Sequence, residues 1–208
     1  MTFDVSALSD ADKALPVVDP AIRALLPGLR LEGTAFTVVA EDDHLPVFAA
    51  LEAAAPGDVL VIATNGGTRA VFGELFATEA KRRGIAGLAV DGYCRDLRGL
   101  REIGLPIYAR GTTPASGTTV SRAAHGQTIN FGGVTVEPGF AVHGDDDGLL
   151  IAPAGQVEAA REKAEAIAGA EQAMLAAMAR GETLHDQTNF AEHVACLDAG
   201  TRSSLAFK

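Results

Sequence analysis

Three short apolar segments, separated by stretches that fit helices, constrain the fold of this chain more than any other feature. They are VLVIA (59–63), LAV (88–90) and LPIYA (105–109). Continuous apolar runs between turn residues are typical of strands that are buried on both faces of a parallel sheet. The intervening segments, Glu74–Arg83 and Arg95–Glu102, predict helices that end at glycines. This strand–helix–strand–helix–strand order predicts a short parallel α/β layer.

The neighbouring segments predict the rest of an α/β domain. Gly33–Ala40 is rich in β-branched residues and predicts another strand, while Leu45–Ala55 predicts a helix. Residues 111–150 are rich in Gly, Thr and Val, which predicts several short strands that form a β-rich layer beside the α/β layer. Residues 156–180 predict a long helix that ends at Gly181.

The two ends of the chain carry weaker patterns. Residues 1–30 predict one or two short helices interrupted by prolines. Residues 182–208 are polar and only weakly patterned. We therefore predict a single domain over residues 1–181 and a C-terminal tail over residues 182–208.

Composition and charge exclude several classes of protein. Apolar residues make up 48% of the 208 residues, which is enough for a core and excludes a disordered chain. The net charge of −10 argues against a nucleic-acid partner, because binding to the phosphate backbone rests on Lys and Arg. The N-terminal residues lack a signal-peptide pattern, and no run approaches the ~20 apolar residues of a membrane span. We therefore expect a cytoplasmic protein with no membrane partner, whose cysteines, Cys94 and Cys196, are free thiols.

Two glycine-containing segments after the first apolar run form one candidate ligand site. They are TNGG (64–67) and GELF (73–76). A helix that begins near Glu74 leaves its first N–H groups unpaired, and such donors suit a carboxylate or a phosphate. The spacing is neither GxGxxG nor that of a P-loop, so it does not favour a nucleotide. Two tight turns without a ligand are an equally good interpretation.

The segment DGYCRD (91–96) is a second candidate, because ligands usually collect at strand ends in open α/β layers. Arg95 offers a fork that matches a carboxylate, and Asp96 offers an oxygen ligand to a hard cation. The alternative is a turn at Asp91-Gly92 followed by the start of a solvated helix. From local sequence alone this alternative is at least as good.

A single carboxylate interrupts the apolar face of the predicted long helix. Glu171 lies between Ile167 and Met174 on a face with the three-four spacing of a buried seam, which also contains Val157, Ala160, Ala164 and Met178. A carboxylate on such a face is unfavourable unless it is paired or lies near a metal. Either the face opens to solvent at this turn, or Glu171 points into a polar site, which could belong to a neighbouring subunit.

The remaining motifs give no further site. DDDG (145–148) lacks the spacing of a calcium-binding loop and is interpreted as a turn. The five histidines have no zinc-ligand spacing, and the sequence has no nucleophile signature and no candidate Schiff-base lysine.

The segment GGTRAVFGELFATEAKRRGIAGLAVDGYCRDLRGL (66–100) resembles the class II 4-hydroxy-4-methyl-2-oxoglutarate aldolases, which are related to the regulator of ribonuclease activity A. The resemblance continues through LPIYARGTTP (105–114) and GDDDGLLIAP (144–153), and it covers most of residues 30–181. Its most specific part is GEL followed by RGxxGxxxDGxxRD. The segment Thr112–Gly132 and the tail beyond Gly181 depart from the family pattern, so they leave the substrate and the subunit contacts open.

The resemblance implies a swivelling β/β/α-type domain that assembles as a homotrimer or as a homohexameric dimer of trimers. It implies that Asp96 binds Mg²⁺, with Mn²⁺ or Co²⁺ as possible substitutes, and that Arg95 contacts the carboxylate and keto oxygen of the substrate. Glu74 would hold metal-bound waters. The backbone N–H groups of Leu75 and Phe76, which follow Gly73, would bind the pyruvyl carboxylate. Glu171 matches a family glutamate that reaches in from the neighbouring subunit, since it lies ten residues before Gly181.

The implied activity is retro-aldol cleavage or decarboxylation of a small 2-oxo acid with a 4-carboxylate, such as 4-hydroxy-4-methyl-2-oxoglutarate or oxaloacetate, to give pyruvate. Mg²⁺ and Arg95 would stabilise the enolate, and a water oriented by Glu74 and Glu171 would transfer the proton. The main alternative is a non-enzymatic protein that binds and regulates a ribonuclease, although such a protein has no need of the Arg95–Asp96 pair. A phosphate- or nucleotide-binding domain is a third and weaker interpretation.

Overall fold

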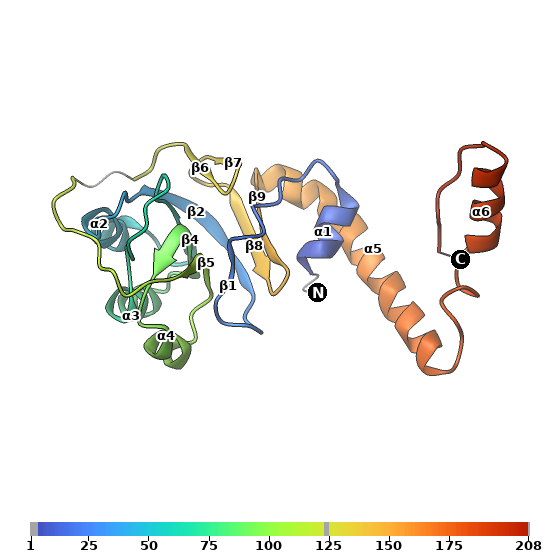
Figure 1. Cartoon of the computed structure of the whole chain (residues 1–208), viewed down its shortest axis with the longest axis horizontal. Coiled ribbons are helices and arrows are strands. Elements are labelled where there is room, and N and C mark those ends of the chain that lie inside the picture. Colours follow the sequence, from blue (N-terminus) through green and yellow to red (C-terminus); the bar gives the residue numbers. More distant parts are fainter. Residues whose placement is uncertain (1–3, 123–124, 208) are drawn as a thin grey trace.

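A seven-stranded mixed sheet forms the centre of the protein in a computed structural model, which describes residues 4–122 and 125–207 (Figure 1). The strand order is β1-β5-β4-β3-β2-β8-β9. The four central strands are parallel, and β1, β8 and β9 pair antiparallel at the two sides. The strands are β1 (Arg23–Ala24), β2 (Leu31–Val39), β3 (Asp58–Ala63), β4 (Gly87–Cys94), β5 (Ile107–Thr112), β8 (Ala141–Asp145) and β9 (Gly148–Ala152). The three apolar runs are the adjacent strands β3, β4 and β5, which confirms the predicted parallel α/β layer.

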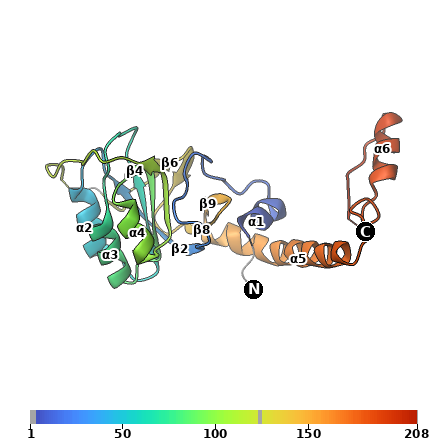
Figure 2. The same cartoon turned by 60° about the horizontal axis from the view of Figure 1, so that its bottom comes forward.

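Three helices lie side by side on one face of this sheet (Figure 2). They are α2 (Leu45–Ala53), α3 (Glu74–Arg82) and α4 (Leu97–Ile103). A cluster of buried side chains fills the space between these helices and the strands, and it includes Leu60, Ile62, Phe72 and Leu100. Because β3 is buried along almost its whole length, its continuous apolar sequence is explained by cover on both faces.

The opposite face of the sheet is covered by a small hairpin of β6 (Ile129–Phe131) and β7 (Val134–Val136), which forms a separate two-stranded sheet. Phe131 and Tyr108 are among the large side chains in the second core cluster on this face. The segment predicted as a β-rich layer is therefore divided, because β8 and β9 extend the main sheet instead. The resulting hairpin, sheet and helix layers confirm the predicted β/β/α arrangement.

The strand predicted over Leu88–Val90 continues through Asp91 and Gly92 to Cys94, so the prediction that it ends at Asp91-Gly92 is wrong. The pairing of β4 with β5 is irregular between Val90 and Tyr93. A Cβ atom at Gly92 would lie 2.7 Å from Oγ1 of Thr64, so glycine is required by close packing here and not by a turn. Tertiary contacts thus override a local turn signal.

The cysteines are both free thiols, as predicted, and they differ in their surroundings. Cys94 is fully buried at the end of β4, and burial raises the pKa of its thiol to about 12. Cys196 lies on α6 (Phe190–Asp198) and is partly exposed.

The C-terminal part of the chain leads away from the sheet (Figures 1 and 2). The first turns of α5 (Ala154–Ala179) pack with α1 (Val5–Ala11) and β9 around a third apolar cluster. The second half of α5 projects from the domain, and Leu175 and Met178 are 57% and 42% exposed there. Helix α6 lies in the segment predicted as a weakly patterned tail, and none of its residues is buried. No helix in the described part of the chain is long and apolar enough to span a membrane.

Candidate functional site

The end of β4 and the start of α3 bring six of the seven predicted site residues together. A cavity of about 210 Å³ lies at this edge of the sheet. It is lined by His44, Gly73, Leu75, Phe76, Arg95, Asp96 and Thr119. Glu74, the sixth predicted residue, lies beside this cavity and lines an adjoining one with Asp96.

Asp96 adopts a backbone conformation that turns its carboxylate away from its own helix. The residue has φ +62° at the N-cap position of α4, and its side chain makes no capping hydrogen bond. Instead, Oδ2 accepts a hydrogen bond from the backbone N–H of Glu74 at 3.2 Å, and Nε of Arg95 lies 3.4 Å from the same oxygen. Left-handed conformations are unfavourable for residues other than glycine, and they cluster at functional sites. The strain at Asp96 therefore supports a functional role for its carboxylate.

Two glycines let the carboxylates of the site lie directly against the backbone. A Cβ atom at Gly73 would overlap Oδ2 of Asp96 and would lie 2.9 Å from Cγ of Arg95. A Cβ atom at Gly99, in α4, would overlap the carboxylate of Glu74. Both glycines are thus explained by close approach of acidic side chains.

The first turn of α3 offers hydrogen-bond donors for an anion. Ala77 is the first residue of α3 whose N–H donates to a backbone carbonyl of the helix, that of Gly73 at 3.1 Å. The N–H groups of Leu75 and Phe76 therefore have no acceptor within the helix. The side chain of Leu75 is exposed, and the guanidinium of Arg95 lines the same cavity. Free N–H groups at a helix N-terminus next to an arginine suit a carboxylate.

The acidic residues fit a cation that keeps most of its water. Glu74, Asp96 and Glu102 line an open cavity of about 470 Å³, together with Leu97, Arg98 and Gly99. Within residues 4–122 and 125–207, no group of three or more His, Cys, Asp or Glu side chains is arranged to hold a metal. Mg²⁺ usually retains several waters and takes only one or two protein carboxylates. Asp96 as a direct ligand, with Glu74 beside it, therefore fits Mg²⁺ and does not fit a cage built entirely of protein ligands.

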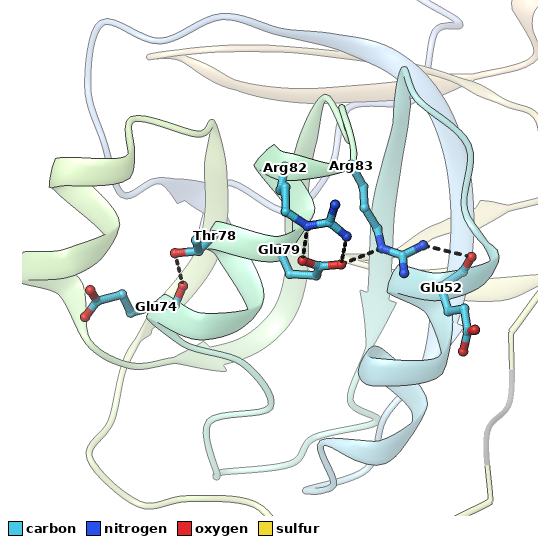
Figure 3. Close-up of polar contacts among 6 residues, drawn as sticks. All are labelled: Glu52, Glu74, Thr78, Glu79, Arg82 and Arg83. Carbon is cyan, nitrogen blue, oxygen red and sulfur yellow. Dashed lines mark hydrogen bonds and ion pairs between the residues drawn. The ribbon is translucent and has the colours of Figure 1, made fainter.

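Helix α3 is fixed by charged contacts at its far end, which leave the Glu74 carboxylate free (Figure 3). Glu79 accepts hydrogen bonds from Arg82 and Arg83, and these two arginines lower its pKa to about 2. Arg83 also donates to the backbone carbonyl of Glu52 in α2 at 3.3 Å. In Figure 3 the carboxylate of Glu74 points away from this cluster, and it has no hydrogen bond or ion pair within the described residues.

A buried carboxylate holds the loop after β5 over the cavity. Asp43 is 0% exposed, and it accepts hydrogen bonds from the hydroxyl of Thr118 and from the N–H groups of Leu45, Val120 and Ser121 at 2.6–3.0 Å. Burial alone would raise the pKa of Asp43, but these four donors outweigh burial and lower the pKa well below its usual value. The loop thereby places Thr119 at the cavity.

Replacement of Asp43 by Asn is expected to lower the free energy of unfolding by about 1–3 kcal/mol, because an amide cannot accept all four hydrogen bonds. The lowered pKa means that the carboxylate stabilises the fold fully above its ordinary value of 3.8 and less as the pH falls below it. The difference between wild type and Asp43→Asn should therefore be constant from pH 7 to pH 5 and shrink below pH 4. Urea unfolding at each pH measures it, and a difference that grows in acid would contradict this account.

The structure does not bring Glu171 to the site within one chain. Glu171 is exposed on the projecting half of α5 and has no hydrogen bond or ion pair within the described residues. The TNGG segment is also separate, because it closes on itself through a hydrogen bond from the N–H of Gly67 to the carbonyl of Thr64 at 3.0 Å. For that segment the interpretation as a tight turn is the better one.

His44 and Thr119 line the cavity and were missed from the sequence. His44 precedes α2, more than 25 residues before Gly73, and has no ligand-like spacing to another histidine. Thr119 belongs to the segment Thr112–Gly132, which departs from the family pattern. No local signal identifies either residue.

Comparisons with known proteins find relatives over most of this chain. The family described as "RraA-like: Aldolase/RraA" matches residues 5–151. A protein of Halalkalibacterium halodurans, provisionally named a 4-hydroxy-4-methyl-2-oxoglutarate aldolase, is 39% identical over 166 residues, which are 79% of each chain. A solved structure of an uncharacterized Pseudomonas syringae protein has a TM-score of 0.79 and 27% identity, over 88% of this chain and 92% of that one. The RNA-processing inhibitor RraA of Thermus thermophilis has a TM-score of 0.68 and 28% identity, over 74% of this chain and 94% of that one.

Proposed function

The chain belongs to the RraA-like family of aldolase and RraA proteins, and on this premise we propose that it is a divalent-metal-dependent lyase that cleaves a C–C bond in a 2-oxo acid and releases pyruvate. The observation that carries the proposal is the carboxylate of Asp96, a residue in a left-handed backbone conformation, which lies between Arg95 and the N–H of Glu74 at the start of α3. A protein that only binds another protein has no need of this arrangement.

The substrate is bound by its 2-oxo acid end. Its carboxylate accepts hydrogen bonds from the N–H groups of Leu75 and Phe76, where the partial positive charge of the helix N-terminus adds attraction. The guanidinium of Arg95 binds the keto oxygen and the same carboxylate. Asp96 would hold Mg²⁺, with Mn²⁺ or Co²⁺ as substitutes, and the ion when bound would supply Lewis-acid polarisation of the keto group.

Bond cleavage leaves negative charge on the keto oxygen as the enolate forms. Arg95 stabilises this charge in a site where it is already oriented, so little reorganisation is needed during the reaction. Glu74, whose carboxylate is free of other partners, transfers a proton to the enolate carbon through a water. The same site serves retro-aldol cleavage of 4-hydroxy-4-methyl-2-oxoglutarate and decarboxylation of oxaloacetate, because both pass through pyruvate enolate.

A homotrimer, or a dimer of trimers, completes the proposal. The projecting half of α5 carries the exposed apolar side chains of Leu175 and Met178, and among its residues after Ile167 only Ala177 is buried within the described part of the chain. A helix that is apolar on most faces is normally buried. Packing of α5 on a second copy would cover this surface and would bring Glu171 toward a neighbouring site, where it would orient water together with Glu74.

A ribonuclease-binding regulator is the second candidate, and it is favoured by the fold shared with the Thermus RNA-processing inhibitor. The two candidates differ in what they require of Arg95 and Asp96. A regulator would retain a ribonuclease in a pull-down even after both residues were replaced, and it would not turn over 2-oxo acids.

The test of the lyase proposal is pyruvate release from both substrates, measured by coupling to lactate dehydrogenase, with Mg²⁺ and with EDTA. We expect turnover with Mg²⁺, its loss in EDTA and its recovery when Mg²⁺ or Mn²⁺ is added back. If pyruvate release from both substrates is no faster with the protein than with Mg²⁺ in the absence of protein, the lyase proposal is rejected. Turnover that persists unchanged in EDTA would reject the metal requirement.

A further inference from the structure

His44 is the one imidazole that lines the cavity in the described part of the chain. It occupies the N-cap position of α2 and is half-buried. Its ring centroid lies 5.8 Å from that of Phe76, which lines the same cavity together with Arg95 and Asp96. An imidazole is the side chain best suited to accept and donate protons near neutral pH. Its presence beside the predicted substrate groups therefore calls for a chemical role.

The hydrogen bonds of His44 determine which ring nitrogen can accept a proton. Nδ1 lies 2.9 Å from the backbone carbonyl oxygen of Val71, and a carbonyl can only accept, so Nδ1 carries the hydrogen. Nε2 lies 2.9 Å from Oγ of Ser116. In the neutral ring Nε2 is then an acceptor, and the hydroxyl of Ser116 donates to it. The tautomer is that of a general base with its lone pair on Nε2.

The backbone of the loop that carries Ser116, the partner of Nε2, is fixed next to His44. The backbone N–H of His44 donates to the carbonyl of Thr118 at 2.8 Å, so the start of α2 and the loop are joined directly. A Cβ atom at Gly117 would lie 2.6 Å from the carbonyl oxygen of Asp42, which shows how closely the loop approaches. The hydrogen bonds to Asp43 fix the same loop from the other side. The loop backbone thus places Ser116 beside Nε2, and rotation about χ1 of Ser116 can move its hydroxyl away while the loop stays in place.

We propose that His44 is the general base that removes the C4-hydroxyl proton of a 4-hydroxy-2-oxo acid, and that the Ser116 hydroxyl occupies the position of that substrate hydroxyl in the free protein. Nε2 has one lone pair, so the substrate hydroxyl replaces that of Ser116. This inference rests on the proposed lyase function and adds a base for its aldol reaction.

Cleavage of the 4-hydroxy-2-oxo acid combines proton transfers with one bond cleavage. The C4 hydroxyl proton moves to Nε2 of His44, and the O–H electron pair forms the new C4 carbonyl. The C3–C4 bond breaks, and its electron pair forms the enolate of pyruvate. A water oriented by Glu74 gives a proton to C3, and the hydroxide that remains takes the proton from Nε2 of His44, so both the water and the imidazole return to their starting states. In oxaloacetate, C4 is a carboxylate carbon and bears no hydroxyl group. CO₂ therefore leaves directly from this carboxylate, without removal of a hydroxyl proton. His44 therefore has a proton to remove in the aldol reaction and none in the decarboxylation.

The experiment compares the two reactions in His44→Asn. General bases contribute about 10²–10⁴-fold, so we expect kcat for cleavage of 4-hydroxy-4-methyl-2-oxoglutarate to fall about 100-fold. Oxaloacetate decarboxylation should fall by only about threefold, so the ratio of the two rates should fall about 30-fold. His125→Asn is the matched control, because His125 lies outside the cavity, and it should leave the ratio unchanged. Ser116→Ala should lower aldol cleavage by less than about tenfold, because the base remains.

Each outcome decides the assignment. An equal loss on both substrates in His44→Asn, or no loss on either, would overturn the role of His44 and leave the lyase proposal standing. A loss in Ser116→Ala as large as that in His44→Asn would also overturn it, because Ser116 would then be required for the chemistry. Thermal unfolding of each variant shows whether it is folded. Absence of turnover by the wild-type protein on both substrates would reject the lyase function itself, and the His44 assignment with it.

Discussion

Replacement of Asp96 by Asn is expected to lower turnover of both substrates by about 10³-fold and to abolish divalent-metal binding. The amide has nearly the same shape, and its oxygen can still accept the hydrogen bond that the N–H of Glu74 donates to Asp96 in the wild type. The variant therefore removes the negative charge and keeps the packing. Steady-state kinetics give the activity, and calorimetric titration with Mn²⁺ gives the metal affinity independently of turnover.

Asp147→Asn is the matched control for Asp96→Asn. Asp147 belongs to the acidic turn between β8 and β9, and it lines a different cavity with Asp4, Asp145 and Asp146. The control removes one negative charge from a cavity that shares no lining residue with the cavities at Asp96. It should retain wild-type kinetics and Mn²⁺ affinity. Turnover within tenfold of wild type in Asp96→Asn would remove Asp96 from the mechanism.

Replacement of Gly73 by Ala is expected to lower kcat by about 100-fold with little change in stability. The backbone of Gly73 is extended, with φ −155°, so alanine is allowed without strain. The new methyl group would overlap Oδ2 of Asp96 and crowd Cγ of Arg95, so both side chains must move. A displacement of about 1 Å at a catalytic group can reduce the rate about 10²-fold.

The control for Gly73→Ala is Gly155→Ala, near the start of α5. A Cβ atom at Gly155 would meet nothing within 4 Å, so the substitution should leave kcat unchanged. Gly99→Ala should have a smaller effect than Gly73→Ala, because the methyl group displaces the flexible end of Glu74 and not Asp96. Urea unfolding separates activity loss from destabilisation. A Gly73→Ala variant with wild-type kcat would mean that the position of Asp96 is not critical.

The predictable part of the site is the part that parallel-sheet topology determines. The apolar runs identify β3 and β4, and the carboxyl ends of neighbouring parallel strands meet at one edge of a sheet. The loop after β3 leads into α3, and Arg95 and Asp96 follow β4, so Gly73, Glu74 and Asp96 meet at this edge. Neither the left-handed conformation of Asp96 nor its hydrogen bond to the start of α3 has a signal in the sequence.

The unpredictable part depends on contacts between distant segments. His44 meets Ser116 across 72 residues of sequence, and Asp43 meets Val120 across 77. Neither pair has a spacing that periodicity could reveal, because the intervening chain includes β3, β4 and β5 and the helices between them. The DG dipeptide at 91–92 misleads for the same reason, since packing against Thr64 and not a turn requires its glycine. Glu171 shows a further boundary, because the contact with a neighbouring copy that we propose for it would leave no trace in the fold of one chain.

The projecting half of α5 makes one part of this molecule sensitive to dilution. The sheet and its covering helices bury most of their apolar residues within a single chain, so their folding does not depend on protein concentration. In the proposed assembly, Leu175 and Met178 leave water when another copy covers them, so the order of this helical segment depends on protein concentration. Samples diluted from micromolar to nanomolar concentration should therefore fray at α5 while the β-sheet core remains intact, and the concentration at which the protein is assayed becomes a variable of its chemistry.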